Sequence, residues 1–128
     1  MEEKYDVLGK WPTEENHDLF GKCPFVTAQK IIAGKWAVMI LHNLSLKTLR
    51  FGELQRELPD LTQATLTKQL RSLEEYGLVN RYVYPQVPPK VEYSLTDIGK
   101  EFQIVLDSIS VWGEKYIGHM KETEIAQK

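Results

Sequence analysis

One stretch of the sequence constrains the fold more than any other: residues 51–76 have the pattern of two short helices separated by a tight break. Apolar residues at positions i, i+3 and i+7 indicate the first helix: Phe51, Leu54 and Leu58. Pro59-Asp60-Leu61 interrupts that helix, and Thr62 can cap a second one. The apolar positions of the second helix are Leu66, Leu70 and Leu73. Two helices joined by a three-residue turn predict a helix-turn-helix, although many helical proteins contain such a pair without binding DNA.

A strand–loop–strand pattern follows the second helix directly. Gly77 suits the left-handed position after a helix, and Leu78 supplies the apolar contact expected there. Leu78–Tyr84 and Val91–Leu95 are typical of strands, and the proline-rich tip at 85–89 is incompatible with a helix. A helix-turn-helix followed at once by a β-hairpin predicts a winged helix. The alternative is a surface hairpin unrelated to the helix pair.

Three further helices are expected before this region. Thr13 can cap a helix that runs to about Phe20, with Glu14 and Glu15 in its first turn. Cys23-Pro24 begins a second helix, which ends at Gly34. The apolar residues of Lys35–Leu46 leave little polar surface, so we expect that helix at the centre of the core. A short connection through Lys47, Thr48 and Leu49 then leads to the helix-turn-helix.

The last part of the chain predicts one long helix. Thr96 can cap it, with Asp97 in its first turn. Apolar residues then recur at spacings of four and three: Ile98, Phe102, Val105, Ile109, Trp112 and Tyr116. Ile104, Leu106, Val111 and Ile117 add apolar surface beside that stripe. A helix on one small domain rarely needs this much apolar surface, so the pattern predicts a homodimer formed through the helix. The alternative is a core helix packed within one subunit.

These patterns predict a mainly α chain with a small β-hairpin, an α+β winged helix-turn-helix with a long C-terminal dimerisation helix. At 128 residues one structural unit is expected. It divides into an N-terminal acidic arm or helix at 1–20, expected to associate with the dimer, a DNA-binding domain at 21–95, and a C-terminal helix and tail at 96–128. No apolar run approaches the length of a membrane span, and residues 1–10 lack the apolar segment of a signal peptide. We therefore expect a cytoplasmic protein without membrane partners.

Charge is distributed unevenly along the chain. The net charge is −2, yet residues 21–90 carry ten basic and five acidic side chains. The two ends together carry six lysines and thirteen acidic side chains. A nucleic-acid interface needs a local basic face rather than a high overall pI, so the overall acidity does not exclude one. Random scatter of charge is the alternative.

The ordered series of short motifs resembles the HxlR-type family of bacterial transcriptional regulators, a branch close to the MarR-like winged helices. The shared motifs are Cys23-Pro24, Gly34-Lys35-Trp36, Arg50-Phe51, Glu53-Leu54, Leu66-Thr67, Gln69-Leu70-Arg71, Leu73-Glu74, Gly77-Leu78-Val79, Tyr84 to Thr96 with Gly99, and Trp112-Gly113. The resemblance covers about residues 20–117 and leaves out the acidic arm. It implies a homodimer that binds operator DNA near its own or neighbouring genes as a repressor or an activator. Some members of the family sense electrophiles or oxidants through a cysteine near the N-terminus.

The helix that begins after Thr62 is the expected recognition helix. At 100° per residue, its leucines point one way, while Ala64, Lys68, Arg71 and Glu75 point the other way. The best candidates for contacts with base edges are Gln63, Thr65, Thr67 and Lys68, and the small Ala64 allows close approach or contact with a thymine methyl. Each of these residues alone could equally be an ordinary solvated side chain.

Other basic and polar residues are candidates for contacts that position the protein without reading sequence. The candidates for phosphates are Arg71, Lys35, Arg50, Arg81 and Lys90. Arg81 could instead simply cover the face of its strand. The hairpin tip, which includes Gln86, is expected to reach an adjacent minor groove. A two-fold dimer would place two recognition helices about 34–36 Å apart, so the operator should be an inverted repeat.

Cys23 is the single cysteine, which excludes an internal disulfide and any cysteine-based zinc cage. It lies at a helix N-terminus beside Lys22, where the helix dipole favours a thiolate, so a redox-sensing role is one interpretation. The other is a buried, inert cysteine that packs the start of the helix.

No other chemistry is readable. His17, His42 and His119 lack metal-ligand spacing, and the sequence contains no phosphate-binding glycine loop and no catalytic triad pattern. We therefore expect no metal, no cofactor and no enzymatic activity, although a small-molecule or oxidant effector is compatible with the sequence. The main alternative to a DNA-binding regulator is a winged-helix protein–protein interaction module without sequence-specific DNA binding.

Overall fold

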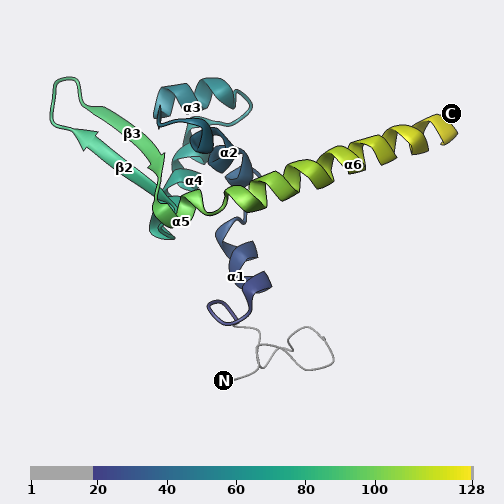
Figure 1. Cartoon of the computed structure of the whole chain (residues 1–128). Coiled ribbons are helices and arrows are strands. Elements are labelled where there is room, and N and C mark those ends of the chain that lie inside the picture. The colour runs from purple at the N-terminus through teal and green to yellow at the C-terminus, as the bar shows by residue number, and fades with distance from the viewer. Residues whose placement is uncertain (1–18, 128) are drawn as a thin grey trace.

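The computed structural model describes residues 19–127. In chain order its elements are α1 (Pro24–Ile31), α2 (Ala37–Leu46), β1 (Leu49–Arg50), α3 (Phe51–Glu57), α4 (Gln63–Glu75), β2 (Val79–Tyr84), β3 (Lys90–Leu95), α5 (Asp97–Lys100) and α6 (Gln103–Gln127). Figure 1 shows α2, α3 and α4 gathered beside the β2–β3 hairpin, which extends from them as a wing. The winged helix-turn-helix is therefore confirmed.

The sheet has three antiparallel strands in the order β1-β3-β2. The wing hairpin pairs Val79 with Leu95 at its base and Tyr84 with Lys90 beside the tip. On the other side of β3, Leu49 pairs with Tyr93 and Arg50 with Glu92. The short connection expected through Lys47, Thr48 and Leu49 is thus wrong at its last residue, because Leu49 belongs to a strand, β1, at the edge of the sheet.

Local signals set the two ends of α4. The Thr62 hydroxyl oxygen accepts a hydrogen bond from the Thr65 backbone N–H at 3.1 Å, as expected of an N-cap. Gly77 has a φ of +84°, which favours glycine after the helix. The N–H of Leu78 then donates to the Leu73 carbonyl at 2.9 Å and satisfies one of the last carbonyls of α4. These contacts fix where α4 starts and where the wing begins.

The core lies between α2, α3, α4 and the base of the sheet. Ile40, Leu41 and Leu44 of α2 are buried in it, so the central position predicted for this helix is confirmed. The leucines predicted for the inner faces of α3 and α4 are buried there too: Leu54, Leu58, Leu66, Leu70 and Leu73. Burying one such side chain contributes roughly 1.5–3 kcal/mol. This core holds α4 with its other face outward.

The long C-terminal helix is confirmed as α6, but the prediction that it runs unbroken from Thr96 is wrong. Thr96 does cap a helix, accepting from the Gly99 N–H at 3.1 Å, but that helix is α5 and ends at Lys100. The chain then turns: Phe102 N–H donates to the Gly99 carbonyl at 3.1 Å, and Val105 N–H donates to the Phe102 carbonyl at 2.9 Å. The turn lets Phe102 pack against the core. Leu106, expected to add free apolar surface, is also buried.

The first expected helix, from Thr13 to about Phe20, lies almost wholly outside the described residues, as does most of the 1–20 arm. Leu19 and Phe20 are described and are not helical. The next helix is confirmed as α1, which ends shortly before Gly34.

Two helices project from the core. Figure 1 shows α1 extending away from one side and α6 extending along another. No residue of α1 is buried, and Leu106 is the buried side chain among the described residues of α6. No helix within residues 19–127 combines the length and apolar character needed to cross a membrane.

Candidate nucleic-acid interface

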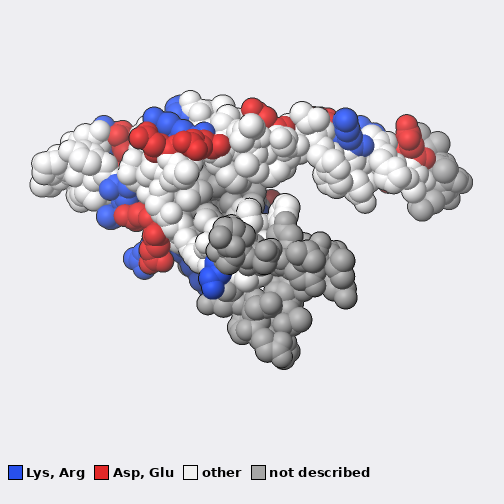
Figure 2. Space-filling model, turned by 60° about the horizontal axis from the view of Figure 1, so that its bottom comes forward, with Lys and Arg blue, Asp and Glu red and all other residues white. Residues whose placement is uncertain are grey.

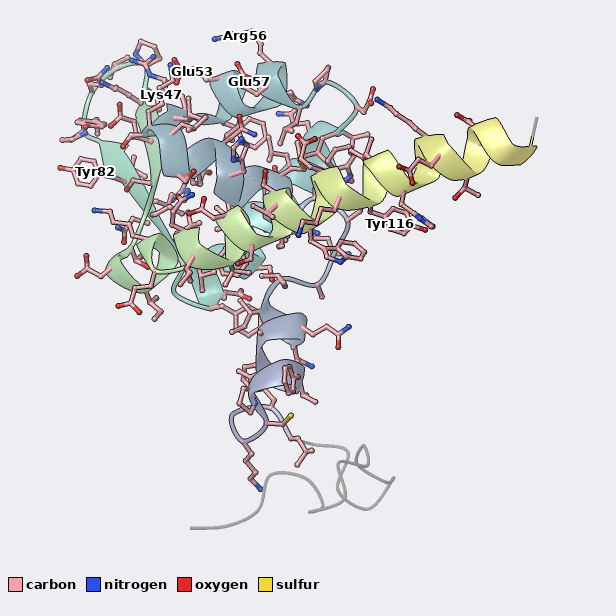
Figure 3. The ribbon with its side chains drawn as sticks, turned by 45° about the vertical axis from the view of Figure 1, so that its right-hand side comes forward. Lys47, Glu53, Arg56, Glu57, Tyr82 and Tyr116 are labelled. Carbon is pink, nitrogen blue, oxygen red and sulfur yellow. The ribbon has the colours of Figure 1, made fainter. Side chains whose placement is uncertain are left out.

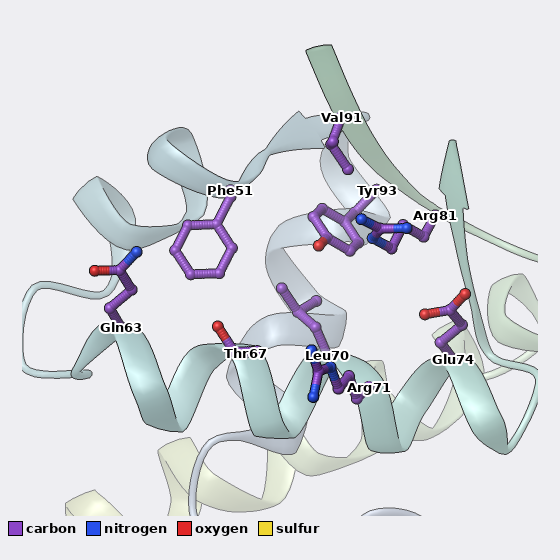
Figure 4. A pocket seen from close by; sticks show the side chains of 9 residues that line it. All are labelled: Phe51, Gln63, Thr67, Leu70, Arg71, Glu74, Arg81, Val91 and Tyr93. Carbon is purple, nitrogen blue, oxygen red and sulfur yellow. The ribbon is translucent and has the colours of Figure 1, made fainter. Parts of the chain in front are cut away.

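A recess of about 500 Å³ lies between α4 and the wing. Figure 4 shows Gln63, Thr67, Arg71 and Glu74 along α4, with Arg81 on the strand side facing the helix. The remaining lining side chains are apolar or aromatic: Phe51, Leu70, Val91 and Tyr93. The fold therefore brings four predicted DNA-contact residues, Gln63, Thr67, Arg71 and Arg81, to one concave site.

A second, shallower hollow follows the outward face of α4. It is lined by Gln63, Ala64, Thr67, Lys68, Arg71, Ser72 and Glu75. Because Leu66, Leu70 and Leu73 hold the opposite face in the core, this face presents polar and charged side chains to solvent. Two of them are basic, Lys68 and Arg71, and one is acidic, Glu75. Gln63, Thr67 and Arg71 line both hollows, so they stand on the ridge between the outward face of α4 and the recess.

Thr65 forms two hydrogen bonds with Thr62 at the start of α4. Its hydroxyl oxygen accepts a hydrogen bond from the Thr62 hydroxyl at 2.9 Å, and its backbone N–H donates to the same Thr62 oxygen. The side chain is half-buried, whereas Gln63, Ala64 and Lys68 are exposed. Thr65 therefore supports the start of the helix as well as standing among the predicted base contacts.

The other predicted phosphate contacts are not gathered with the recess. Strand pairing places Arg81 opposite Tyr93, on the face of the sheet that lines the recess. Since side chains alternate along a strand, Lys90 points to the opposite face, and Arg50, paired with Glu92, points there too. Lys35 precedes α2, with its Nζ 5.3 Å from the ring centroid of Trp36. Gln86 is exposed in the wing tip.

The wing face turned away from the recess carries a linked cluster that the sequence did not reveal. The Tyr84 hydroxyl donates to Glu92 Oε1 at 2.8 Å, and Lys90 Nζ lies 3.5 Å from Glu92 Oε2. Lys90 Nζ also stands 4.5 Å from the centroid of the Tyr84 ring. The Tyr82 ring meets Tyr84 edge-on, with 4.7 Å between centroids, and Figure 3 shows Tyr82 projecting from the wing.

These contacts shift two ionisation equilibria. The hydrogen bond from Tyr84 lowers the pKa of the Glu92 carboxyl below its ordinary 4.5, and the positive charges of Lys90 and Arg50 act in the same direction. The same hydrogen bond raises the pKa of the Tyr84 hydroxyl above its ordinary 10.0. Glu92 is therefore a charged carboxylate, and Tyr84 a neutral phenol, at neutral pH.

Sequence reasoning also missed four lining residues of the recess, Phe51, Glu74, Val91 and Tyr93. Val91 and Tyr93 could have been found, since residues two apart on a strand share a face. Phe51 had been placed in the core, and it does pack against the core while lining the recess. Glu74 brings a negative charge to the end of the recess nearer the base of the wing.

The apolar stripe predicted along the last helix is exposed on α6. Trp112 is 65% exposed and stacks on Tyr116, which is 48% exposed, with 5.3 Å between ring centroids. Val105 and Ile109 continue this stripe toward the core and are also exposed. In the view of Figure 2, charged side chains are few and widely separated along α6, and Figure 3 shows Tyr116 on its surface.

The remaining members of the stripe lie at its base. Ile98 is exposed on α5, whereas Phe102 packs against the core. Both line an apolar hollow of about 270 Å³, together with Val105, with Ala28 and Ile31 of α1, and with Ile32, which follows that helix. The hollow joins the exposed side of α1 to the start of the α6 stripe.

Cys23 is completely buried and has no disulfide partner. It is the N-cap residue of α1, and its backbone N–H donates to the Leu19 carbonyl at 2.8 Å. Its position is therefore the one expected of a buried cysteine that packs the start of the helix, rather than of an exposed thiol. Within residues 19–127 there is no cluster of three His, Cys, Asp or Glu side chains that could hold a metal ion.

Comparison with known proteins identifies the family. The profile of the HxlR-like helix-turn-helix family matches residues 31–121. The chain belongs to the HxlR family. It is similar to the HTH-type transcriptional regulator YdeP of Bacillus subtilis (strain 168), with 45% identity over 111 residues that cover 87% of each chain. The predicted resemblance is thereby confirmed, and the chain is a helix-turn-helix transcriptional regulator of the HxlR and MarR type.

Two solved structures of bacterial regulators are similar to the chain. The redox regulator HypR in its reduced form has a TM-score of 0.74 and 39% identity, covering 78% of this chain and 99% of that one. The transcriptional regulator YodB from B. subtilis in its reduced form has a TM-score of 0.66 and 32% identity, covering 73% of this chain and 93% of that one. The structural similarity to these regulators therefore extends over most of the chain.

Proposed function

We propose that this HxlR-family protein is an operator-binding transcriptional regulator that inserts α4 into the major groove of DNA. The observation that carries the proposal is the ridge of α4, where Gln63, Thr67 and Arg71 stand between an outward basic face and the recess under the wing. An α-helix fits the major groove, in which each base pair presents its own pattern of donors and acceptors. Acting on the chromosome, such a regulator would work in the cytoplasm.

The residues divide into two roles. Gln63, Ala64, Thr65 and Thr67 lie in the first half of α4, where their short or amide side chains suit base edges. Lys68 is exposed on the outward face and can donate to guanine or to a phosphate. Arg71 and Arg81 flank the recess and suit phosphates, which fix the register of the protein without reading sequence. Arg50, Lys35, Lys90 and Gln86 remain candidates for backbone contacts.

A homodimer follows from the projecting helices. The stripe of Val105, Ile109, Trp112 and Tyr116 exposes large apolar side chains that a second copy would cover. Ile98 and Phe102 extend this surface into the hollow beside α1. Two-fold symmetry would then present two α4 helices to an inverted repeat.

We further propose that oxidation of Cys23 regulates DNA binding. The support for this is the similarity to HypR, a redox regulator solved in oxidised and reduced forms, and to YodB, solved also after diamide treatment. Cys23 is the single cysteine, so a disulfide would join it to a second subunit or to a small thiol. Because the thiol is buried, oxidation would first require the start of α1 to open.

The test is fluorescence anisotropy at ~150 mM salt with DNA upstream of the protein's own gene and a scrambled duplex of the same composition. Specific sites are typically at least ~10³-fold tighter than non-specific DNA, and a gap of that order would support the proposal. Equal, weak binding to both duplexes would count against it and favour a protein–protein interaction module.

A further inference from the structure

The wing carries a charged pair in which Glu92 engages Lys90, one of the candidates for a contact with the DNA backbone. Lys90 stands at the end of β3 next to the tip, where a cation would meet the DNA backbone. Its ammonium group lies 3.5 Å from one oxygen of Glu92 and 4.5 Å from the centroid of the Tyr84 ring. Lys90 is thus already engaged on two sides within its own strand pair.

Glu92 is held in place independently of Lys90. Its other oxygen, Oε1, accepts a hydrogen bond from the Tyr84 hydroxyl at 2.8 Å, across the β2–β3 pairing. The side chains of Lys90 and Glu92 are each 26% exposed. A carboxylate fixed by a neighbouring strand stays beside the wing tip even when the flexible lysine moves toward a phosphate.

The electrostatic attraction between the wing and DNA phosphates therefore depends on the net charge of Lys90 and Glu92 together. Exposed ion pairs are weak, so Lys90 can leave Glu92 at little cost. The carboxylate, however, remains well within the ~8 Å screening length of any phosphate that Lys90 reaches. Its repulsion offsets the attraction of the ammonium group, and the pair acts as one neutral unit. Arg50, which faces the same side of the sheet from β1, keeps its own charge.

We propose that Glu92 is a positioning residue of the wing: its carboxylate holds Lys90 and Tyr84 and cancels the charge that Lys90 would add to DNA binding. This inference rests on the proposed function. It predicts that the wing docks by shape and by its proline-rich tip, while the sequence-independent attraction comes from Lys68, Arg71 and Arg81.

The test measures binding to a random-sequence duplex by anisotropy between ~50 and ~200 mM salt, where the slope of log K against log salt counts neutralised phosphates at about 0.9 each. Glu92→Gln keeps an acceptor for the Tyr84 hydroxyl and removes the charge. We expect its slope to steepen by about 0.9 and its affinity at ~150 mM salt to rise about three-fold. The Lys90→Gln/Glu92→Gln double variant should return to the wild-type slope.

Two further variants control for structure. Tyr84→Phe removes the hydrogen bond but keeps the ring and the charge balance, so its slope should equal that of the wild type. Lys90→Glu/Glu92→Lys exchanges the two charges and should also keep that slope, even if Glu92→Gln folds poorly.

The inference is overturned if Glu92→Gln leaves the slope unchanged, or if the double variant matches Lys90→Gln alone. Either result would mean that Glu92 does not cancel a contribution of Lys90 to DNA binding. The proposed function fails separately, when the wild-type protein shows no salt-dependent binding to any duplex.

Discussion

Arg71 of α4 and Arg81 of β2 line the same recess from its two walls, one on the helix and one on the wing. They are ten positions apart in the sequence, and the turn at Gly77 between α4 and β2 brings them together. Two guanidinium groups converging on one concavity suit a DNA backbone that runs between the recognition helix and the wing.

Removing the cations of α4 should weaken DNA binding independently of sequence. Lys68→Ala and Arg71→Ala together remove two exposed charges, so the salt slope should become shallower by about 1.8. Anisotropy on operator and random duplexes measures this. The matched control, Lys115→Ala with Lys121→Ala, removes two exposed cations from α6 and should leave the slope unchanged. An unchanged slope in the α4 variant would refute the placement of the recognition helix.

The aromatic stack on α6 should hold the dimer together. Trp112→Asp or Tyr116→Asp places a charge in the exposed stripe, and we expect the dissociation constant to rise by about 30-fold or more. Sedimentation velocity over a range of concentrations measures it. Ile104→Asp is the matched control, since Ile104 is 72% exposed but lies about 120° around the helix from the stripe. Equal dissociation in all three variants would place the interface elsewhere.

The wing should lose stability in acid because of Glu92. Its pKa is lowered in the folded state, first by the Tyr84 hydrogen bond. The stabilisation is therefore present above the ordinary value of 4.5 and is lost as the pH falls through the lowered folded pKa. The pKa of Tyr84 is raised, so its contribution is present below 10.0 and is lost as the pH rises through the raised folded pKa.

Urea unfolding between about pH 3 and pH 6 tests the acid limb. Tyr84→Phe removes the main cause of the Glu92 shift, so its stability should fall less steeply with acid than that of the wild type. Tyr82→Phe, which leaves the Tyr84–Glu92 hydrogen bond in place, should follow the wild type. If Tyr84→Phe also matches the wild type, the hydrogen bond contributes nothing to the pH dependence.

The thiol of Cys23 should react slowly in the folded protein, because it is buried. Diamide should weaken or alter operator binding in the wild type only after a lag set by opening at the start of α1. Cys23→Ser should bind the operator normally and show no response to diamide. A normal response in that variant would dispose of the thiol mechanism, because the chain has no other cysteine.

The helix-turn-helix and the wing were predictable because short-range signals specify them. Thr62 caps α4 through its own side chain, and Gly77 adopts the left-handed conformation that ends it. The outward face of α4 followed from the spacing of its buried leucines. The sequence therefore predicted the candidate residues on the recognition helix together with the fold.

Features that depend on tertiary contacts were not predictable in this way. Strand β1 has only two residues, Leu49 and Arg50, and exists because they pair with β3. The spacing of Ile98, Phe102 and Val105 continues across the break between α5 and α6, so periodicity concealed it; the turn lets Phe102 reach the core.

The two faces of the wing likewise depend on register. Sequence reasoning grouped Arg81 and Lys90 as phosphate contacts, but pairing of Arg81 with Tyr93 turns Lys90 to the other face. The contacts of Glu92 with Tyr84 and Lys90 require that same register.

Selection of duplexes from a random pool at ~150 mM salt tests the central claim most directly, since it needs no assumption about where the operator lies. We predict enrichment of an inverted repeat whose half-sites are about one helical turn apart, 10–10.5 base pairs, or a multiple of that spacing. The enriched duplex should bind at least ~10³-fold more tightly than its scrambled version. A pool that shows no enrichment after repeated rounds, with equal affinity for all duplexes, would contradict sequence-specific binding by α4.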